Sequence, residues 1–485
     1  MSNSSSYAED TKQWIPTEFN DVNIGDARLN QRLISIAESF CLSPSTSIPD
    51  KSGSWAKTKA TYRFLNNNKV SHENILAPHQ HATAKRVSQE QTVLAIQDTT
   101  TLNYTSHPET QGLGNIGTDP ASKGILVHTT LTLTPNRIPL GLVHQQTWVR
   151  PPEEYGKKHD RHNKALQDKE SQKWLNSLWA TEQLQKDYPG TLIINTGDRE
   201  ADIFGLFQEH RDNRMRCQLL VRAMHDRNLT NPEEHLWSYL ERQPVACRLE
   251  VTVPRKKQKA QRTAQVELHW AEVTLKPPID KSDAGSITLR AIYLNEPNPP
   301  SGEEALSWML LTTLAIQSEE DAVQYVEYYA LRYTIELFHK VLKSGCGIEE
   351  HQFESVEALM GCLAIDSIVA WRIMFLTMLG RALPDLPCNS ICQADEWKSL
   401  YCSLHHTSEP PEQAPSLGEA IRMIAKLGGF LGRKRDGQPG VEVLWRGMEK
   451  LSIIVESWKS FRPACPARFP LCGTGGTGTV GKCGG

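Results

Sequence analysis

The stretch Tyr328–Lys343, "YYALRYTIELFHKVLK", has the periodicity of an amphipathic helix with one unusually polar side. At about 100° per residue its polar groups fall on a single stripe, which consists of Tyr329, Arg332, Glu336, Lys340 and Lys343. The opposite side is almost entirely apolar, so we expect the helix to pack on a sheet. The stripe itself fits either a solvated face held by i,i+4 charge pairs or part of a functional site.

The length and composition describe a folded globular protein of several domains. A chain of 485 residues exceeds the size of one ordinary core, and its length predicts about three domains. Hydrophobic residues make up 39% and charged residues 22%, which excludes a disordered chain. The net charge of −3 gives no whole-chain sign of nucleic-acid binding, but Pro254–Arg262 and Gly432–Gly437 are local basic segments that could bind phosphates.

The first residues and the most apolar segment indicate a cytoplasmic protein. The opening "MSNSSSYAEDTKQW" lacks the basic and then apolar pattern of a signal peptide. The most apolar long run, Cys362–Leu379, contains Asp366 and Arg372, which predicts a buried helix rather than a membrane span. The 11 cysteines show no disulfide-framework spacing and fit reduced thiols.

Hydrophobic periodicity divides the chain into helical and β-rich parts. Up to Thr92 the pattern is helical, with a Ser/Pro-rich loop. β-rich runs follow, among them Gly124–Val149, and then a strand that leads through Asp198 into a helix. The segment Asn228–Thr313 alternates with a period of two and predicts an antiparallel insertion, and after Leu379 the pattern is helical again. We therefore expect a mixed sheet with a helix-covered face.

Two aspartates stand at similar places in this pattern. Asp98 closes the apolar run "VLAIQD", and Asp198 closes "LIINTGD". If the two strands are neighbours, the carboxylates lie side by side and repel one another unless a cation separates them. Oxygen ligands of this kind suit Mg²⁺ or Mn²⁺. A third carboxylate from a helix on the same sheet, such as Glu336, would complete a two-metal site.

Three segments in this order resemble the signatures of the DDE transposases of the insertion-sequence-four (IS-four) family, in particular its transposon-five branch. They are "AIQDTTTLNY" (Ala95–Tyr104), "GDREAD" (Gly197–Asp202) and "YALRYTIELFHKVLK" (Tyr329–Lys343). The third segment fits the family pattern Tyr-x2-Arg-x3-Glu-x6-Lys with Tyr329, Arg332, Glu336 and Lys343. Weaker similarity extends over residues 20–461.

The resemblance implies an α/β fold with an RNase H-like catalytic core and a β-rich insertion, flanked by helical domains at both ends. The implied domains are an N-terminal DNA-binding domain (1–72), the catalytic domain (73–379, insertion about 225–315) and a C-terminal dimerisation domain (380–461). The Gly-rich segment 462–485 departs from the family, and its composition predicts a disordered tail. The implied activity is cut-and-paste transposition: one strand is nicked, a hairpin forms and is resolved, and the end is joined to target DNA.

The resemblance also assigns roles to single residues. Asp98, Asp198 and Glu336 would hold two Mg²⁺ ions, with Mn²⁺ as an alternative. Tyr329, Arg332 and Lys343 would grip phosphates around a nucleotide displaced from the stack, and Trp308 would stack on its base. Arg222 matches a further basic, DNA-binding position near the active site. From the sequence alone, Trp308 also fits ordinary core packing beside Met309.

The implied partners are double-stranded DNA, both as terminal inverted repeats and as target, and a second copy of the chain. In the N-terminal domain, Arg28, Arg32 and Arg63 match positions of DNA contact, although solvated arginines would look the same. A bacterial protein of this kind would sit on the nucleoid when it is bound to DNA.

Two other functions remain open at the level of sequence. One is a non-catalytic regulator derived from a transposase, and the other is an RNase H-type nuclease without strand transfer. The segment Gly476–Cys483 imitates a phosphate-binding loop, but it lacks the Ser/Thr and the following helix that such loops need. The Cys and His residues between Cys388 and His406 fit no zinc spacing.

Overall fold

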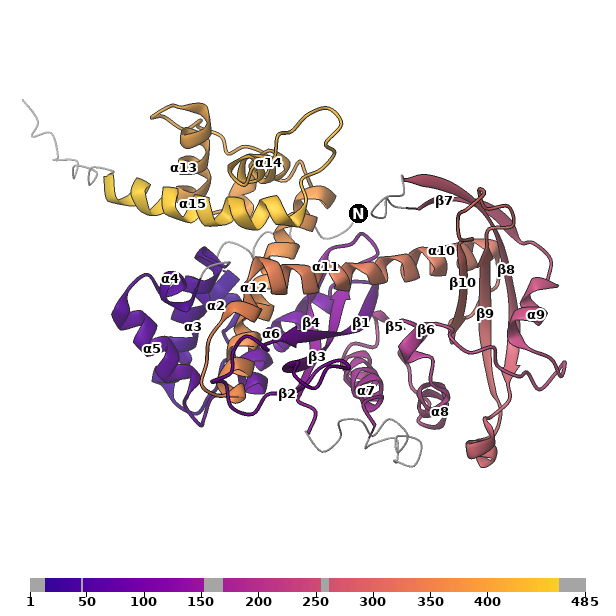
Figure 1. The fold of residues 1–485 in the computed structure, drawn as a ribbon. Coiled ribbons are helices and arrows are strands. Elements are labelled where there is room, and N and C mark those ends of the chain that lie inside the picture. The colour runs from indigo at the N-terminus through magenta and orange to yellow at the C-terminus, as the bar shows by residue number, and fades with distance from the viewer. Residues whose placement is uncertain (1–13, 45–46, 152–168, 254–260, 462–485) are drawn as a thin grey trace, which may run out of the picture.

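The computed structural model describes residues 14–44, 47–151, 169–253 and 261–461 and has a mixed α/β architecture (Figure 1). The α-helices are α2 (Trp14–Glu18), α3 (Ala27–Leu42), α4 (Ile48–Ser52), α5 (Trp55–Leu65), α6 (His72–Val87), α7 (Gln172–Asp187), α8 (Phe204–Asp212), α9 (Leu236–Glu241), α10 (Glu319–Ala330), α11 (Thr334–Lys340), α12 (Val356–Ala382), α13 (Ala394–His405), α14 (Leu417–Leu427) and α15 (Val441–Phe461). The strands are β1 (Thr92–Asn103), β2 (Gly114–Asn115), β3 (Lys123–Leu133), β4 (Pro139–Trp148), β5 (Leu192–Gly197), β6 (Gln218–Arg222), β7 (Cys247–Val253), β8 (Arg262–Leu275), β9 (Ile287–Asn295) and β10 (Ser307–Thr312). Short helical turns are η4 (Arg199–Ala201), η5 (Ile279–Ala284), η6 (Leu331–Tyr333), η7 (Val341–Gly345), η8 (Ile348–Glu350) and η9 (Cys388–Ser390).

The strands of the described residues form one sheet in the order β2-β3-β1-β5-β6-β10-β9-β8-β7, with β4 paired to β3. β1 runs antiparallel to β3 and parallel to β5, and β5 runs parallel to β6. The five strands β4-β3-β1-β5-β6 therefore join an antiparallel meander to a parallel pair, which is the strand order of an RNase H-like core. The prediction of a mixed sheet is confirmed.

The insertion is antiparallel, as the alternating pattern of Asn228–Thr313 predicts. It continues the same sheet, because β10 pairs with β6 and places Leu310 opposite Arg222. Burial alternates along the outer strand β7, as expected for a strand with one face on the core and one face in water. The insertion thus lengthens the sheet from the edge next to β6.

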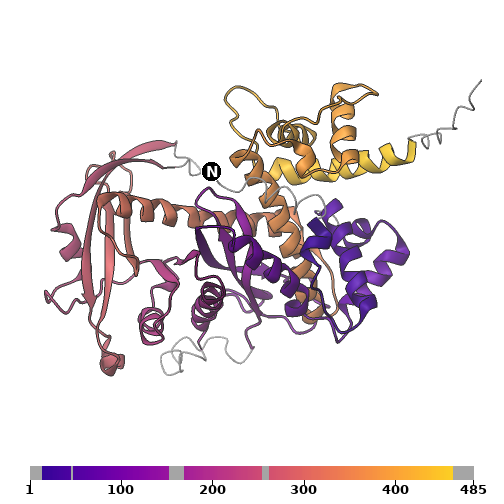
Figure 2. The same ribbon diagram turned by 180° about the vertical axis from the view of Figure 1, so that it is seen from behind.

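Both faces of the sheet are covered, and the covering helices belong to two separate hydrophobic clusters. In β6, Leu220 joins the cluster that contains α6, α10, α11 and α12, whereas Leu219 and Val221 join the cluster that contains α7, α8 and α9. Successive residues of a strand point to opposite faces, which explains this division. Figures 1 and 2 show α11 and α12 on one side of the strands and α7 and α8 on the other.

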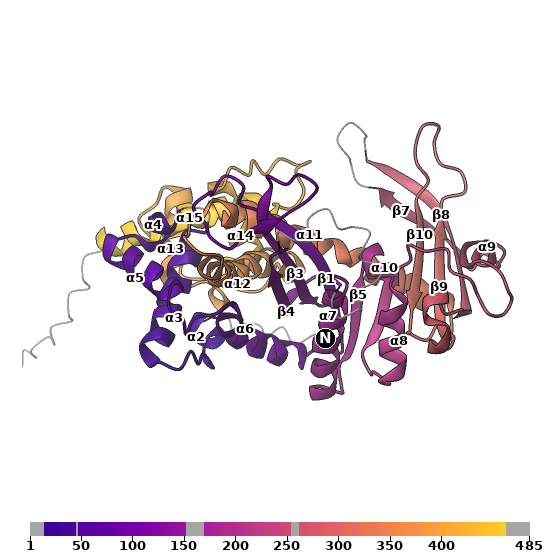
Figure 3. The same cartoon turned by 60° about the horizontal axis from the view of Figure 1, so that its bottom comes forward.

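The outer parts of the molecule lie at different ends of this core. Figure 3 shows the N-terminal helices α2–α5 at one end of the sheet and the strands of the insertion at the opposite end. The C-terminal helices α13, α14 and α15 form a layer over α11 and α12 (Figure 1). The helices predicted in the first part of the chain and after Leu379 therefore lie apart from the insertion.

The segment Tyr328–Lys343 is one helical run but not one regular α-helix. It passes from α10 through the 3-10 turn η6 into α11 and then into η7, which is π-helical. In η7 the N–H of Cys346 donates to the carbonyl of Val341 at 2.8 Å, the i+5 spacing of a π-turn. The prediction of a uniform helix is wrong at both ends of α11. The apolar side is buried at Ile335 as predicted, but Ala330, assigned to that side, is exposed.

The helix α12 contains the apolar run Cys362–Leu379 and is long and apolar enough to cross a membrane, but 89% of its most apolar window is buried inside the protein. The prediction of a buried core helix is confirmed. The two charges within Cys362–Leu379 have partners: Asp366 accepts a hydrogen bond from the ammonium of Lys51 on α4 at 3.0 Å, and both side chains are fully buried. The guanidinium of Arg372 lies 5.1 Å from the centre of the Trp14 ring.

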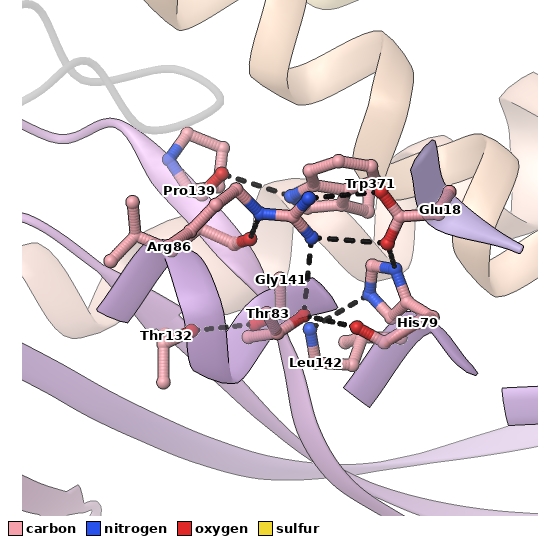
Figure 4. Close-up of polar contacts among 10 residues, drawn as sticks. Glu18, His79, Thr83, Arg86, Thr132, Pro139, Gly141, Leu142 and Trp371 are labelled. Carbon is pink, nitrogen blue, oxygen red and sulfur yellow. Dashed lines mark hydrogen bonds and ion pairs between the residues drawn. The ribbon is translucent and has the colours of Figure 1, made fainter. Parts of the chain in front are cut away.

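A second buried polar cluster ties α2, α6 and α12 together (Figure 4). Arg86 Nη1 donates to Glu18 Oε2 at 2.9 Å, and His79 makes a short contact with the other carboxylate oxygen. The Arg86 guanidinium stacks 4.4 Å from the Trp371 ring, whose N–H donates to the carbonyl of Pro139 at 2.9 Å. Burial alone would raise the pKa of Glu18, but Arg86 and His79 outweigh it and lower that pKa to about 2.

Some predicted features lie outside the described residues. These are the Gly-rich tail 462–485, the loop-like segment Gly476–Cys483 and most of the basic segment Pro254–Arg262. Within that last segment Arg262 is described, and it pairs with the buried carboxylate of Glu296. Arg262 is predicted to contact a phosphate backbone, but in this structure its guanidinium already pairs with Glu296.

Candidate active site

The register of the sheet brings Asp98 and Asp198 to the same edge. Ile96 of β1 pairs with Thr196 of β5 in parallel register. Asp98 lies two residues after Ile96, and Asp198 lies two residues after Thr196. Carboxyl ends of adjacent parallel strands meet at one edge, where polar side chains emerge. Glu336 joins them from α11, which packs on β1. The structure thus assembles the three predicted carboxylates from three elements.

Arg332 lies among these carboxylates. Its Nη2 donates to Glu336 Oε1 at 2.7 Å, and its Nη1 is 3.7 Å from Asp98 Oδ2. The Arg332 side chain is only 15% exposed, and Nη1 is buried without a hydrogen-bond partner among the described residues. In this structure the guanidinium faces the acidic cluster, whereas the resemblance assigns it to DNA phosphates.

The aspartates are held so that one oxygen of each is turned to the backbone. Asp98 Oδ1 accepts from the Thr99 N–H at 2.8 Å, and Asp198 Oδ1 accepts from the Glu200 N–H at 2.9 Å, where it caps the turn η4. These bonds fix Asp198 directly after the end of β5, and they fix Asp98 inside β1, just past the point where β1 stops pairing with β5. The prediction that Asp98 closes its strand is wrong, because β1 continues to Asn103 through its pairing with β3. The second oxygen of Asp98 faces the Arg332 guanidinium, with Oδ2 3.7 Å from Nη1.

The electrostatics of the site are unbalanced toward negative charge. Burial raises the pKa of Asp98 to about 6, and the neighbouring carboxylates of Asp198 and Glu336 add to this, although Arg332 lowers it. Burial also raises the pKa of Asp198. One guanidinium does not neutralise three carboxylates, so additional cations would reduce the repulsion among them. The donor set is all oxygen, so the residues present fit hard divalent ions such as Mg²⁺ or Mn²⁺.

A second group of predicted residues lies beside the acids. The rings of Trp308 and Tyr329 meet edge to face with centroids 5.2 Å apart, and the guanidinium of Arg222 lies 5.7 Å from the Trp308 ring centre. Arg222 also donates to the Ser307 carbonyl at 3.0 Å. Burial raises the pKa of Tyr329, while the nearby guanidinium of Arg332 lowers it.

A cleft of about 650 Å³ opens next to these rings. Its wall includes the predicted Arg222 and Trp308 together with Arg199 and Trp237, which the sequence did not single out. Arg199 could have been found, because it directly follows Asp198 in the signature "GDREAD". Trp237 gave no signal, since it comes from the insertion and reaches the cleft only through the fold.

The two lysines of the predicted stripe have separate surroundings. Lys343 donates to the carbonyl of Thr101 at 2.6 Å and lies 3.8 Å from Glu349, so it faces β1 beyond the acids. Lys340 instead pairs at 3.2 Å with Glu442 at the start of α15. The stripe therefore divides: one lysine is near the site and the other joins the C-terminal helices.

The predicted arginines of the N-terminal helices are not part of this site. Arg28 and Arg32 lie exposed on α3, and Arg63 lies exposed in the last turn of α5. Arg28 is bonded to Asp26, its own helix cap, at 3.2 Å. All three side chains are therefore open to solvent on the N-terminal helices.

The fold and the site together define a class of protein. An RNase H-like sheet with two acids on neighbouring strands and a third on an adjoining helix is the arrangement of the DDE enzymes. Such enzymes cut and join DNA strands with divalent metal ions.

Comparison with known families assigns three consecutive parts of the chain. The family described as "Transposase DNA-binding" matches residues 11–70, "Transposase DDE domain" matches residues 143–365 and "Transposase Tn5 dimerisation domain" matches residues 368–465. The DDE match includes Asp198 and Glu336 and begins after Asp98. Among solved structures, a piggyBac transposase synaptic complex with hairpin DNA covers 96% of this chain and 81% of its own, at 9% identity and a TM-score of 0.36, which is too low to support an inference.

The chain belongs to the Tn5-like DDE transposases, in agreement with the insertion-sequence-four resemblance. It is a metal-dependent enzyme that cleaves DNA and transfers strands, and it carries a DNA-binding part and a dimerisation part. The predicted fold class, an RNase H-like core between two helical domains, is confirmed.

Proposed function

We propose that this transposase performs cut-and-paste transposition with Asp98, Asp198 and Glu336 as the ligands of two Mg²⁺ ions, which Mn²⁺ could replace. The observation that carries the proposal is the parallel register of β1 and β5, which aligns the two aspartates beside α11. When bound, the ions would activate water or a 3′-hydroxyl and stabilise the leaving oxygen.

In this proposal Arg332 has two positions. Without metal ions it neutralises the carboxylates, as its contacts with Glu336 and Asp98 indicate. Once cations bind, the guanidinium is released and turns to a DNA phosphate, for which its planar fork is well suited. Lys343, which faces β1, holds a neighbouring phosphate.

The cleft lined by Trp308 and Arg222 receives a nucleotide displaced from the duplex. Trp308 offers a ring for stacking, and Tyr329 and Arg222 bind the adjacent phosphates. Removal of one nucleotide from the stack lets the strand bend sharply, which a hairpin intermediate requires. We therefore propose that strand cleavage passes through a hairpin that the same site resolves.

The remaining parts recognise and pair the DNA. We propose that Arg28, Arg32 and Arg63 contact the terminal inverted repeats of the element, and that two copies of the chain hold the two ends before they attack a target duplex. The boundaries that fit this division are 1–72, 73–379 and 380–461, with a tail from 462. We place the enzyme in the cytoplasm, on the nucleoid when it is bound to DNA.

The test is cleavage of a supercoiled plasmid that carries the ends of the element, with Mg²⁺ present. Wild-type protein should release the element with hairpin ends, and Asp98→Ala should bind the ends without cutting them. Glu327→Gln is the matched control, because Glu327 is exposed on α10 in the same helical run. Equal products from wild type and Asp98→Ala would reject the proposal, and end binding by both without cleavage would indicate a non-catalytic regulator.

A further inference from the structure

A groove of about 890 Å³ crosses the C-terminal helices, far along the chain from the catalytic acids. One wall comes from α13 and α14, and the other comes from the loop between α14 and α15. The residues that matter for its chemistry are Tyr401, His405, Arg422, Lys426, Arg433 and Lys434. The family match assigns this region to dimerisation and gives the groove no ligand.

The described lining of the groove has a surplus of positive charge, with four Lys or Arg side chains against one carboxylate, Glu419. Arg422 and Lys426 are one helical turn apart on α14, and Arg433 and Lys434 face them from the loop. All four side chains are exposed, and in the described part of the chain none of them pairs with a carboxylate. Two like charges four residues apart repel one another and destabilise a helix, so an anion bound to Arg422 and Lys426 would stabilise α14.

The nearby carboxylates are already engaged by backbone groups. Glu419, the single carboxylate in the wall, accepts from the Ser416 N–H at 2.9 Å in the capping box of α14. Asp436 accepts from the Arg433 N–H at 2.8 Å and so closes the turn of the loop. Both hydrogen bonds hold their carboxylates against the backbone, and neither carboxylate is ion-paired with the four cations in the described part of the chain.

The groove is also linked to the active-site helix. Its wall follows the loop as far as Gln438, and Glu442 comes four residues later, which spans at most about 14 Å of chain. Glu442 bonds Lys340 on α11, the helix that carries Glu336. One turn of duplex DNA is about 34 Å long, so a duplex held at the active site can reach the loop.

We propose that this groove is a second DNA-binding surface, which grips the phosphate backbone of duplex DNA of any sequence. Four exposed cations on two facing walls suit a charged backbone, because Lys and Arg contacts to phosphates carry no sequence information. This contact adds to the DNA-binding part at residues 11–70 and gives the dimerisation region a direct role in holding DNA.

The experiment is the salt dependence of binding to a random-sequence duplex of about 40 base pairs, measured with the full-length chain. Each phosphate contact contributes about 0.9 to the slope of log affinity against log salt, so Arg422→Ala/Lys426→Ala should lower the slope by about 2. Between 50 and 200 mM salt, the variant should lose about tenfold less affinity than the wild type loses. Arg433→Ala/Lys434→Ala should have the same effect.

The matched control is Lys186→Ala/Lys276→Ala, which also removes two exposed cations. Both of these lysines already have a carboxylate partner, Glu182 at 3.6 Å and Glu233 at 3.7 Å, so the slope should not change. A photo-crosslinking residue at Gln438 in the groove wall should label the duplex. If the two groove variants show the same slope as the control variant, the proposal is overturned. If the groove variants lose binding to poly-glutamate but bind DNA as the wild type does, the proposal is also overturned, and the groove is assigned to an acidic protein.

Discussion

Two carboxylate clusters in this protein, one buried and one partly exposed, use the same residue types for opposite purposes. Around Glu18, one carboxylate faces Arg86 and His79, and its pKa falls to about 2. Around Asp98, burial and two further acids face one arginine, and the pKa rises to about 6. Balanced charge makes the first cluster a structural tie between helices, whereas the surplus of negative charge makes the second a place for cations.

The largest effect should come from an acid in the unbalanced cluster. Glu336→Gln should lower the rate of end cleavage by more than about a thousandfold, because the metal stabilises the reaction by several kcal/mol. Its unfolding free energy should hardly change, since the Glu336 side chain is 44% exposed. The rate of cleavage of a labelled end duplex in Mg²⁺ measures this, with Glu327→Gln as the control. A loss smaller than about tenfold would remove Glu336 from the ligand set.

The balanced cluster should give the reverse result. Glu18→Gln should reduce the free energy of unfolding by about 3 to 5 kcal/mol, because it leaves the buried guanidinium of Arg86 without its counter-charge. Urea unfolding measures the loss, and Asp21→Asn, which removes an exposed pair with Lys85, should cost at most about 1 kcal/mol. The folded fraction of Glu18→Gln should still cleave DNA. A variant that is as stable as wild type but inactive would contradict the structural role of the Glu18 cluster.

The same carboxylate predicts how stability depends on pH. The pKa of Glu18 is lowered from 4.5 to about 2 on folding, so its contribution is complete above pH 4.5 and is lost as pH falls toward 2. The difference in unfolding free energy between wild type and Glu18→Gln should therefore shrink by about 2 kcal/mol between pH 6 and pH 3. Urea titrations at the two pH values test this, and a difference that grows on acidification has the wrong sign.

The smallest effect should come from the charge pair that belongs to neither cluster. Lys340 and Glu442 are 51% and 42% exposed, so Lys340→Ala should cost at most about 0.5 kcal/mol. Cleavage should stay within about twofold of wild type, because this lysine faces the C-terminal helices. Thermal unfolding and the cleavage assay on the same sample check both values. A large loss of cleavage would show that the stripe acts as a whole.

Much of the fold and the acidic site follows from local sequence. The alternation along the strands predicts the mixed sheet, and the ends of two apolar runs predict where Asp98 and Asp198 emerge. The resemblance in Tyr329–Lys343 adds Glu336. Each of these features follows from the order of residues within one short segment, so it can be read from the sequence alone.

Features that depend on tertiary packing could not be predicted. The pairing of Glu18 with Arg86 joins residues 68 positions apart, and neither has a spacing that points to the other. The position of Arg332 against the acids depends on the 3-10 turn η6, which no residue pattern announces. Trp237 reaches the cleft only because the insertion continues the sheet beyond β6.

The central claim is that Asp98 contacts a metal ion, and exchange of its oxygen for sulfur tests this most directly. Mg²⁺ prefers oxygen ligands, whereas Mn²⁺, a first-row transition ion, accepts thiolate sulfur more readily. Asp98→Cys should be inactive on end DNA in Mg²⁺ and should regain at least about tenfold in Mn²⁺, which is about 1.4 kcal/mol of restored stabilisation. Equal inactivity in both ions, with wild type active in both, would contradict a metal contact at Asp98.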